Sequence, residues 1–595
     1  MSPTTKRSSE HTPLLAETSP RRSSQESQRL AEEEDAAIHG TPLPAERKRS
    51  TREFFLFAWA FLATAAVIVL TVVLQHRNST SSAPALPGDP ATGDPYAIKP
   101  GLKKDRKRNL VFMVSDGMGP ASLSLTRTFR QHVNNLPMSD TLTLDKHFWG
   151  SSRTRSSNSW VTDSAAGATA FSCARKSYNG AIGMEPGFKP CGTVLEAAKR
   201  AGYKTGLVVT TDITDATPAC FASHVAYRWQ MDEIALQEIG EGVLGRNVDL
   251  MLGGGRCHFL PNTTEGSCRL DNVDVVGIAK EKHGFGYVDD RSGFDSLKLG
   301  KNVNLPLLGL FAPRDVPFEI DRSKMADIYP SLSEMATTAL EALKEATKDT
   351  EQGFFLMIEG SRIDHAGHIN DPAAQVREVL EYDKTFQTVL DFIKASDTET
   401  VLVATSDHET GGLSTAWQGP NELPVYDWHP QILANANASS EYLALLLKQR
   451  IATTPESFLS LVEWIKTDLV QGRLGIPDAL EIEINALASN PDAAQTIFAK
   501  MVSMRARIGW STHGHSAVDV NVYSSGGPGT EKIRGNVENI EVGGFLNGYL
   551  GVDLEPITKE LREKMQEVVV VEEEQGVVGA KGVHPEEWLG VMKGL

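Results

Sequence analysis

Short apolar runs alternate with helical patterns beyond residue 108, and this alternation predicts a parallel α/β sheet. Four runs are typical of buried strands: 109–114, 206–210, 354–358 and 401–404. A fifth segment, 518–523, alternates apolar and polar residues as a half-buried strand does. We therefore expect an α/β fold with a central, mostly parallel sheet flanked by helices on both faces.

One apolar run is much longer than a strand. Residues 54–74 carry no charge over 21 positions, and a helix that crosses a bilayer needs about 20 apolar residues. The apolar part of a signal peptide is usually about 7–15 residues long and lies nearer the N-terminus. The basic residues Arg47, Lys48, Arg49 and Arg52 precede the run, and such residues stay cytosolic. The sequence thus predicts one transmembrane signal-anchor helix and a type II topology.

The segment before the predicted helix, residues 1–53, is rich in Ser, Glu, Arg and Pro and is expected to be a disordered cytosolic tail. Within it, Leu14 and Leu15 follow Glu10 in a pattern that resembles an acidic dileucine signal. Such a signal would bind a sorting adaptor and direct the protein to a vacuolar (lysosome-like) membrane. A chance pair of leucines is the alternative.

The remaining chain divides by composition into a stem, a large folded domain and a tail. The three segments are a Ser/Pro/Gly-rich luminal stem at 75–107, a domain at 108–555, and a C-terminal tail at 556–595 for which we have no functional interpretation.

Charge and cysteine content narrow the class of protein. The formal net charge is −17, which argues against nucleic acid as a partner because such proteins present a basic face. Five cysteines leave at least one unpaired within a monomer. Cys257 and Cys268 bracket a short polar loop and are the favoured disulfide pair. Asn78, Asn262 and Asn437 begin glycosylation motifs, in keeping with luminal placement.

Acidic and imidazole groups follow the predicted strands. In open α/β sheets, ligands bind beyond the carboxyl ends of the strands, so groups that follow several strands are expected to meet at one edge. The candidates are Asp116 after 109–114, Asp212 and Asp215 after 206–210, Glu359 after 354–358, and Asp407 and His408 after 401–404.

A second set of polar residues has metal-ligand spacing. Asp364 and His368 lie four residues apart, so one helical turn would direct both side chains at a shared point. Oxygen and nitrogen ligands without thiolates suit a catalytic Zn²⁺. His513 and His515 offer a further imidazole ligand.

Asp163 and Ser164 precede a run of small residues, 165–174, that is compatible with a helix. The free N–H groups at a helix N-terminus favour an anion, so Ser164 could be a nucleophile for a phosphoryl group. It could equally be an ordinary N-cap. Arg228 could hold two phosphate oxygens with its guanidinium fork, or form a surface salt bridge.

Taken together, these motifs resemble the alkaline phosphatase family over roughly residues 108–555. The shared motifs, in the family's order, are Asp116-Gly-Met-Gly, Asp163-Ser164-Ala165, Asp215-Ala-Thr-Pro-Ala, Asp364-x-x-x-His368 and Asp407-His408. With its anchor the chain is most similar to the fungal vacuolar (repressible) members. The resemblance implies hydrolysis of phosphate monoesters, including phosphopeptides, through a phosphoserine intermediate, with broad specificity and an alkaline optimum.

The resemblance also implies two zinc ions and one magnesium ion per subunit. The implied ligand sets are Asp364, His368 and His515 for the first zinc, Asp116, Asp407 and His408 for the second, and Asp116, Thr217 and Glu359 for magnesium. His515 is preferred to His513 on the family's spacing. Catalysis would use Ser164 and Arg228. Of the surrounding residues, Asp163 would orient Arg228, His365 would contact the phosphate through water, and Asp215 would lie near the magnesium. A homodimer is implied, with residues 420–505 forming an insertion near its interface.

Two other functions are compatible with parts of this pattern. A phosphodiesterase or sulfatase-like hydrolase of the same superfamily would share the metal ligands. The third metal position and Arg228 favour monoesters instead. A membrane-tethered binding protein without activity would be expected to lack some ligands, whereas this sequence has the full set.

Overall fold

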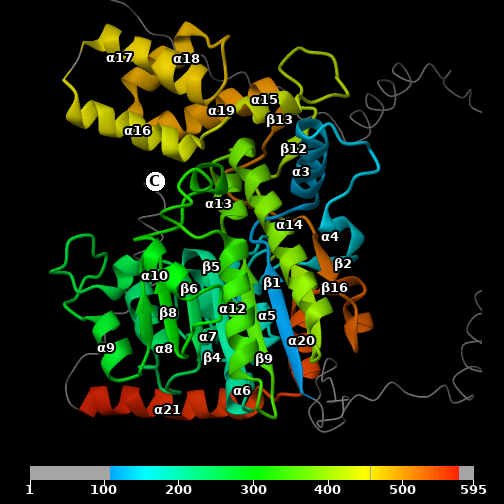
Figure 1. Cartoon of the computed structure of the whole chain (residues 1–595), viewed down its shortest axis with the longest axis vertical. Coiled ribbons are helices and arrows are strands. Elements are labelled where there is room, and N and C mark those ends of the chain that lie inside the picture. Colours follow the sequence, from blue (N-terminus) through cyan, green and yellow to red (C-terminus); the bar gives the residue numbers. More distant parts are fainter. Residues whose placement is uncertain (1–106, 456, 575–595) are drawn as a thin grey trace, which may run out of the picture. The chain divides into compact units, whose positions relative to one another are not determined.

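A computed structural model describes residues 107–455 and 457–574 of the chain. Its centre is a ten-stranded sheet with the order β16-β2-β15-β10-β1-β9-β5-β6-β8-β7 (Figure 1). In this sheet β15 is antiparallel to both neighbours and the other pairs are parallel, which confirms the predicted fold class. The strands are β1 (Arg108–Val114), β2 (Phe148–Arg153), β5 (Lys204–Asp212), β6 (Leu250–Gly254), β7 (Gly286–Val288), β8 (Leu307–Leu310), β9 (Phe354–Glu359), β10 (Glu399–Thr405), β15 (Val520–Ser524) and β16 (Gly535–Glu538).

The four strands predicted from apolar runs are neighbours in the middle of the sheet. They lie in the order β10-β1-β9-β5, and Val114 at the end of β1 pairs with Glu359 on β9 and Thr405 on β10. The carboxyl ends of these strands are therefore level. As predicted, the polar residues that follow them gather at one edge.

Helices cover both faces of the sheet because side chains alternate between the faces along each strand. On β1, Leu110 and Phe112 face one apolar core, whereas Val111 and Met113 face the other. The covering helices are, on the first face, α5 (Ser164–Cys173), α6 (Val194–Arg200), α7 (Ala216–Ala222), α8 (Met231–Ile239), α9 (Val275–Glu281) and α20 (Asn539–Leu550), and on the second, α4 (Thr143–Lys146), α10 (Arg291–Ser296), α12 (Leu332–Ala346) and α14 (Pro372–Ala395).

A separate helical module occupies most of the predicted insertion 420–505 (Figure 1, yellow to orange). The module has an apolar core of its own, the third in the molecule. This core also includes residues of α3 (Pro120–Val133), α13 (Arg362–His368) and the start of α14. The module therefore packs on the elements next to the sheet edge. Its helices are α15 (Pro430–Asn435), α16 (Ser440–Thr453), α17 (Phe458–Trp464), a π-helical turn at Ile465–Arg473, α18 (Glu481–Ser489) and α19 (Ala494–Ala506).

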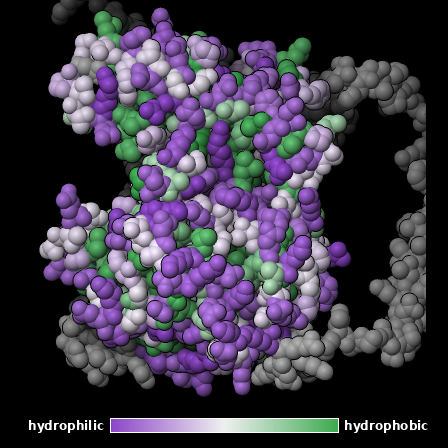
Figure 2. All heavy atoms as spheres, viewed as in Figure 1, coloured by the Kyte–Doolittle hydropathy of each residue, from purple (hydrophilic) through white to green (hydrophobic). Residues whose placement is uncertain are grey.

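The predicted tail begins as helix α21 (Glu555–Glu574), where Ile557 and Leu561 pack on Ala197 of α6. On the face drawn in Figure 2, hydrophilic residues dominate and hydrophobic ones form small patches. None of the helices within 107–455 and 457–574 is long and apolar enough to cross a bilayer. The predicted tail 1–53, the anchor 54–74 and nearly all of the stem 75–107 lie outside the described residues.

Two disulfides are formed. The predicted Cys257–Cys268 bond is confirmed, and Cys173, at the end of α5, bonds Cys191. The latter pair was not predicted, because no local motif joins these two positions. Cys220 is the unpaired thiol and is buried.

Candidate active site

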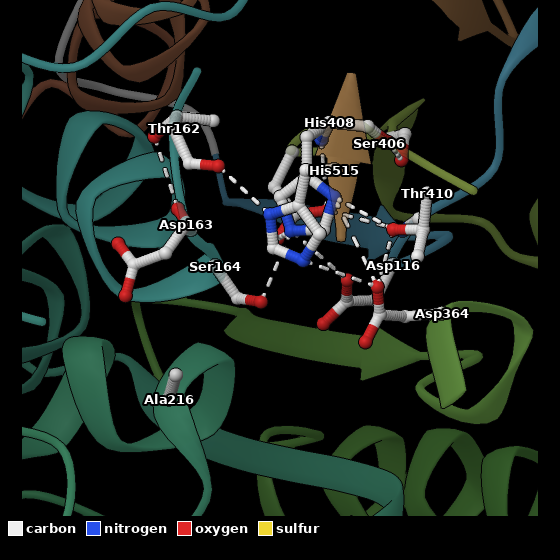
Figure 3. A network of polar contacts seen from close by, with 12 residues as sticks. Asp116, Thr162, Asp163, Ser164, Ala216, Asp364, Ser406, His408, Thr410 and His515 are labelled. Atoms are coloured by element: carbon white, nitrogen blue, oxygen red, sulfur yellow. Dashed lines mark hydrogen bonds and ion pairs between the residues drawn. The ribbon is translucent and has the colours of Figure 1, made fainter. Parts of the chain in front are cut away.

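Ser164 is the first residue of α5, and the cap of that helix is its neighbour. The Asp163 carboxylate accepts a 3.0 Å hydrogen bond from the backbone N–H of Ala166. The Ser164 hydroxyl therefore has no capping role. It is 2% exposed, and its Oγ lies 3.1 Å from Nε2 of His408 (Figure 3). The interpretation of Ser164 as an ordinary N-cap is excluded by this geometry.

Asp116, Asp407 and His408 form a buried cluster beside Ser164. Nε2 of His408 lies 3.2 Å from Oδ2 of Asp407 and 3.5 Å from Oδ1 of Asp116. Those two carboxylate oxygens are buried and have no hydrogen-bond partner among the described residues. Burial and the charge of Asp364 raise the pKa of Asp407 to about 7. Burial and the charges of Asp407 and Asp364 likewise hold the pKa of Asp116 well above its usual range. Such a cluster is stabilised by a cation.

Asp364, His368 and His515 form a second cluster. The first two residues lie one turn apart on α13, as their spacing predicted, with Oδ2 of Asp364 3.2 Å from Nε2 of His368. Nε2 of His515 lies 3.5 Å from Oδ1 of Asp364, and its Nδ1 is 2.8 Å from the carbonyl of Thr162. His513 is exposed, and its ring bonds the backbone carbonyl of His368. The structure therefore brings His515, not His513, to the cluster.

The two clusters touch each other. The rings of His408 and His515 stack with centroids 3.5 Å apart, and Nδ1 of His408 lies 4.0 Å from Oδ1 of Asp364. Gly117 makes this approach possible because its φ is +74° and a Cβ there would stand 2.5 Å from Cα of Asp364. The turn after β1 thus packs directly on α13, and a larger residue at position 117 would separate the clusters.

Glu359 ends β9 and Thr217 lies on α7, which follows β5, so both belong to elements on the β5 side of β1 in the strand order. Burial raises the pKa of Glu359 to about 8, and its charge adds to the rise at Asp116. Oε2 of Glu359 accepts a 2.6 Å hydrogen bond from Ser361. The Thr217 hydroxyl, on the first turn of α7, is buried beside the Glu359 carboxylate and works against the rise in its pKa. An oxygen-only set of this kind suits a hard cation such as Mg²⁺.

Arg228 lies beside the N-terminus of α5. Its Nη2 is 2.8 Å from Oδ1 of Asp215, and its Nη1 is 3.5 Å from Oδ2 of Asp163. Burial works against the charge, but Asp215 and Asp163 raise the pKa of Arg228. Arg228 therefore pairs with Asp163, the neighbour of Ser164 in the chain, and with Asp215 at the start of α7.

His365 is held by a residue that the sequence did not single out. Its Nδ1 lies 3.2 Å from Oδ2 of Asp315, and its Nε2 lies 4.0 Å from Oδ2 of Asp215. Burial works against the imidazolium, but Asp315 raises the pKa of His365 to about 9. Asp315 follows β8, so the rule that marked the other strand ends would have found it. Thr410, which hydrogen-bonds Asp364, has no such signal.

One buried and one partly exposed cluster of carboxylates and imidazoles, a serine at a helix N-terminus and an arginine beside it lie at one edge of a parallel α/β sheet. This combination suits a hydrolase that transfers phosphoryl groups. A family model for alkaline phosphatase matches residues 107–552. The chain belongs to the alkaline phosphatase family. Its enzymes hydrolyse phosphate monoesters, and relatives at high identity support that activity for this chain.

The relatives cover most of the chain. The repressible alkaline phosphatase of Saccharomyces cerevisiae is 54% identical over 477 residues, which is 77% of this chain and 84% of the relative. The Schizosaccharomyces pombe alkaline phosphatase is 48% identical over 463 residues, with the same shares. The crystal structure of Thermus thermophilus alkaline phosphatase matches with a TM-score of 0.63 at 27% identity, covering 81% of this chain and 100% of that one.

Proposed function

We propose that this enzyme hydrolyses phosphate monoesters through a phosphoserine at Ser164, with two zinc ions and one magnesium ion at the clusters described above. The observation that carries the proposal is the position of the Ser164 hydroxyl. It is buried, makes no capping hydrogen bond, and lies 3.1 Å from Nε2 of His408. His408 is also one of the proposed zinc ligands, so this distance places the hydroxyl next to the second metal position, where a bound metal ion would activate the serine. Broad specificity is expected, with phosphopeptides among the substrates, because the charged groups concentrate around the phosphate.

The residues fit the metals that the family uses. Buried oxygens of Asp116 and Asp407 have no hydrogen-bond partner within the part of the chain that the structure describes. Burial first, and neighbouring carboxylates second, raise the pKa of both groups, and a bound cation would offset that cost. The solved structure of a mutant alkaline phosphatase from the Antarctic bacterium TAB5 has Mg bound in its M3 site. When bound, the zinc ions supply Lewis acidity that favours ionised oxygen nucleophiles and an ionised leaving group.

The chain's own residues account for positioning. The two N–H donors of the Arg228 fork and the N-terminus of α5 would hold the non-bridging phosphate oxygens. The Ser164 Oγ loses its proton to solvent and bonds phosphorus, and the ester P–O bond breaks to release the alcohol, which takes up a proton. Water then bonds the phosphorus, the Oγ–P bond breaks, and Ser164 regains its proton. Net, one ester and one water yield alcohol and phosphate.

Substrate comparison tests the proposal against the phosphodiesterase alternative. The metal-loaded enzyme is expected to hydrolyse nitrophenyl phosphate at least about 100-fold faster, in kcat/KM, than bis-nitrophenyl phosphate. A monoester has three unesterified oxygens, so two can contact the Arg228 fork while the third faces the metal positions, whereas a diester has only two. Metal analysis and a pH–rate profile on the same preparation would accompany the assay. Faster hydrolysis of the diester, or a preparation that is active without metal, would contradict the proposal.

Location and assembly are proposed on sequence and resemblance. We infer a type II protein anchored by residues 54–74, with a vacuolar luminal catalytic domain, sorted through Leu14 and Leu15, glycosylated in the lumen, and dimeric through the region near 420–505. In sealed membranes the activity is expected to be latent and resistant to added protease until detergent is added. Activity that is fully accessible without detergent would refute the topology, and a monomer in sedimentation would refute the dimer.

A further inference from the structure

Four aromatic side chains, two exposed and two partly buried, form a cluster that the mechanism does not use. Tyr227 and Trp229 stack with centroids 4.4 Å apart and planes 7° apart. The ring centroid of Phe188 lies 6.0 Å from that of Tyr227 and 5.4 Å from that of Tyr178, and both pairs are arranged edge to face. Phe188 is 52% exposed and Trp229 is 48% exposed. We call these four residues the aromatic ledge.

The aromatic ledge is connected to the phosphate-binding residues through the backbone. Tyr227 and Trp229 flank Arg228, whose backbone N–H donates a 2.8 Å hydrogen bond to the carbonyl of Gly180. The N–H of Gly180 in turn donates a 2.9 Å bond to Oδ2 of Asp163. A Cβ on Gly180 would stand 3.7 Å from the Tyr227 ring and 3.9 Å from the Trp229 ring. One backbone layer therefore separates the rings from the Asp163–Arg228 pair.

The cluster is also fixed in place. The Tyr178 hydroxyl donates a 2.9 Å hydrogen bond to the carbonyl of Ala226, which ties one ring to the segment that carries the stacked pair. Gly183, in the same loop as Tyr178, receives the 3.0 Å N–H bond of Cys191. Rigid aromatic rings bind flat ligands at a low cost in conformational entropy.

From this placement we propose that the aromatic ledge is a subsite for the leaving group of aromatic phosphate monoesters, above all the base of nucleoside monophosphates. The inference rests on the proposed function, because the phosphate must lie between Arg228 and Ser164. The four side chains carry no formal charge and suit a neutral heteroaromatic ring, which stacks on indole or phenol faces without a fixed hydrogen-bond pattern. Small aliphatic esters such as glycerol phosphate would not reach it.

Substitution of Trp229 tests the subsite. In the full-length, metal-loaded enzyme, Trp229→Ala is expected to lower kcat/KM for adenosine monophosphate by about 5- to 100-fold, the range observed for loss of one stacked base. The value for glycerol phosphate should stay within about twofold. Trp229→Phe should restore most of the loss. Tyr426→Ala, which removes an aromatic side chain that is 98% exposed on the loop before α15, is the matched control and should change neither substrate.

A binding measurement separates the subsite from the reaction. Calorimetric titration of adenosine monophosphate into the Ser164→Ala protein should show weaker binding, by a similar factor, when Trp229→Ala is added, with unchanged binding of inorganic phosphate. If Trp229→Ala lowered kcat/KM equally for adenosine monophosphate and glycerol phosphate, or did not lower it for the nucleotide, the proposed subsite would be wrong. If the unaltered enzyme hydrolysed no monoester, the proposed function would fail, and the nucleotide titration alone would still decide for or against the ledge.

Discussion

Replacing Ser164 with alanine is expected to lower kcat for phosphate monoesters by roughly 10³-fold or more, the scale seen when a catalytic nucleophile is removed. The fold should be kept, because the Asp163 carboxylate, not the serine, accepts the capping bond from Ala166. Bound zinc should also remain, since none of the proposed ligands is altered. Steady-state kinetics and metal analysis on the purified variant check both points.

The control for this variant lies on the same helix. Ser172 is also buried in α5, and its hydroxyl bonds within the helix at Thr169. Ser172→Ala should therefore cost stability at most, with kcat unchanged. Acid quench during turnover should trap phosphate on a peptide that contains Ser164 and none in Ser164→Ala. A Ser164→Ala enzyme with undiminished turnover, or a phosphate trapped at another residue, would contradict the assignment of the nucleophile.

The polar residues at the strand ends were predictable from the sequence, because parallel strands place their carboxyl ends at one edge of the sheet. Asp116 and Asp407 follow β1 and β10, and Glu359 ends β9, and these three strands prove to be neighbours. The helical spacing of Asp364 and His368 was predictable for the same kind of local reason. Each of these residues is marked by its own short segment, with no knowledge of distant contacts.

What the sequence could not predict depends on pairing between distant segments. His515 and His513 are equivalent by residue type, and the spacing to the next strand distinguished them only through the family resemblance. In the structure the antiparallel pairing of Thr410 with His515 sets which imidazole meets Asp364. The Cys173–Cys191 disulfide and the contact of Thr410 with Asp364 are long-range in the same sense, and no local pattern encodes them.

Chelation of the metals is expected to abolish turnover and to make stability fall with rising pH. Burial raises the pKa of Asp407 to about 7 and that of Glu359 to about 8, and Asp116 is raised as well. In the unfolded chain such carboxyls titrate near about pH 4. The folded, metal-free protein therefore binds more protons than the unfolded chain up to the raised pKa, so its free energy of unfolding falls as pH rises through that range.

The expected window is about pH 6.5 to 8.5. Below this window the buried His408 has the opposite effect. Its pKa is lowered in the folded protein, so the unfolded chain binds its proton more readily, and the free energy of unfolding rises with pH. Within the window, His365, with its pKa raised to about 9, adds to the fall. Calorimetry should show the metal-free protein melting roughly 5 °C or more lower at pH 8.5 than at pH 6.5. Zinc with magnesium should reduce that difference but not abolish it, because Asp212, Glu378 and His365 are not metal ligands and keep their raised pKa values.

A neutral isostere distinguishes carboxylate repulsion from a general effect of alkali. Asp407→Asn keeps the shape of the side chain but removes one buried charge, so its metal-free form should lose a clear part of the pH dependence while it also fails to regain turnover with zinc. Asp427→Asn, on the exposed loop before α15, should behave like the unaltered protein in both respects. Equal melting temperatures at the two pH values in the metal-free protein would mean that the clustered acids are balanced by groups other than metal ions. The strand-end carboxylates would then be a structural network, and Ser164 would lack the charged surroundings that the proposed chemistry requires.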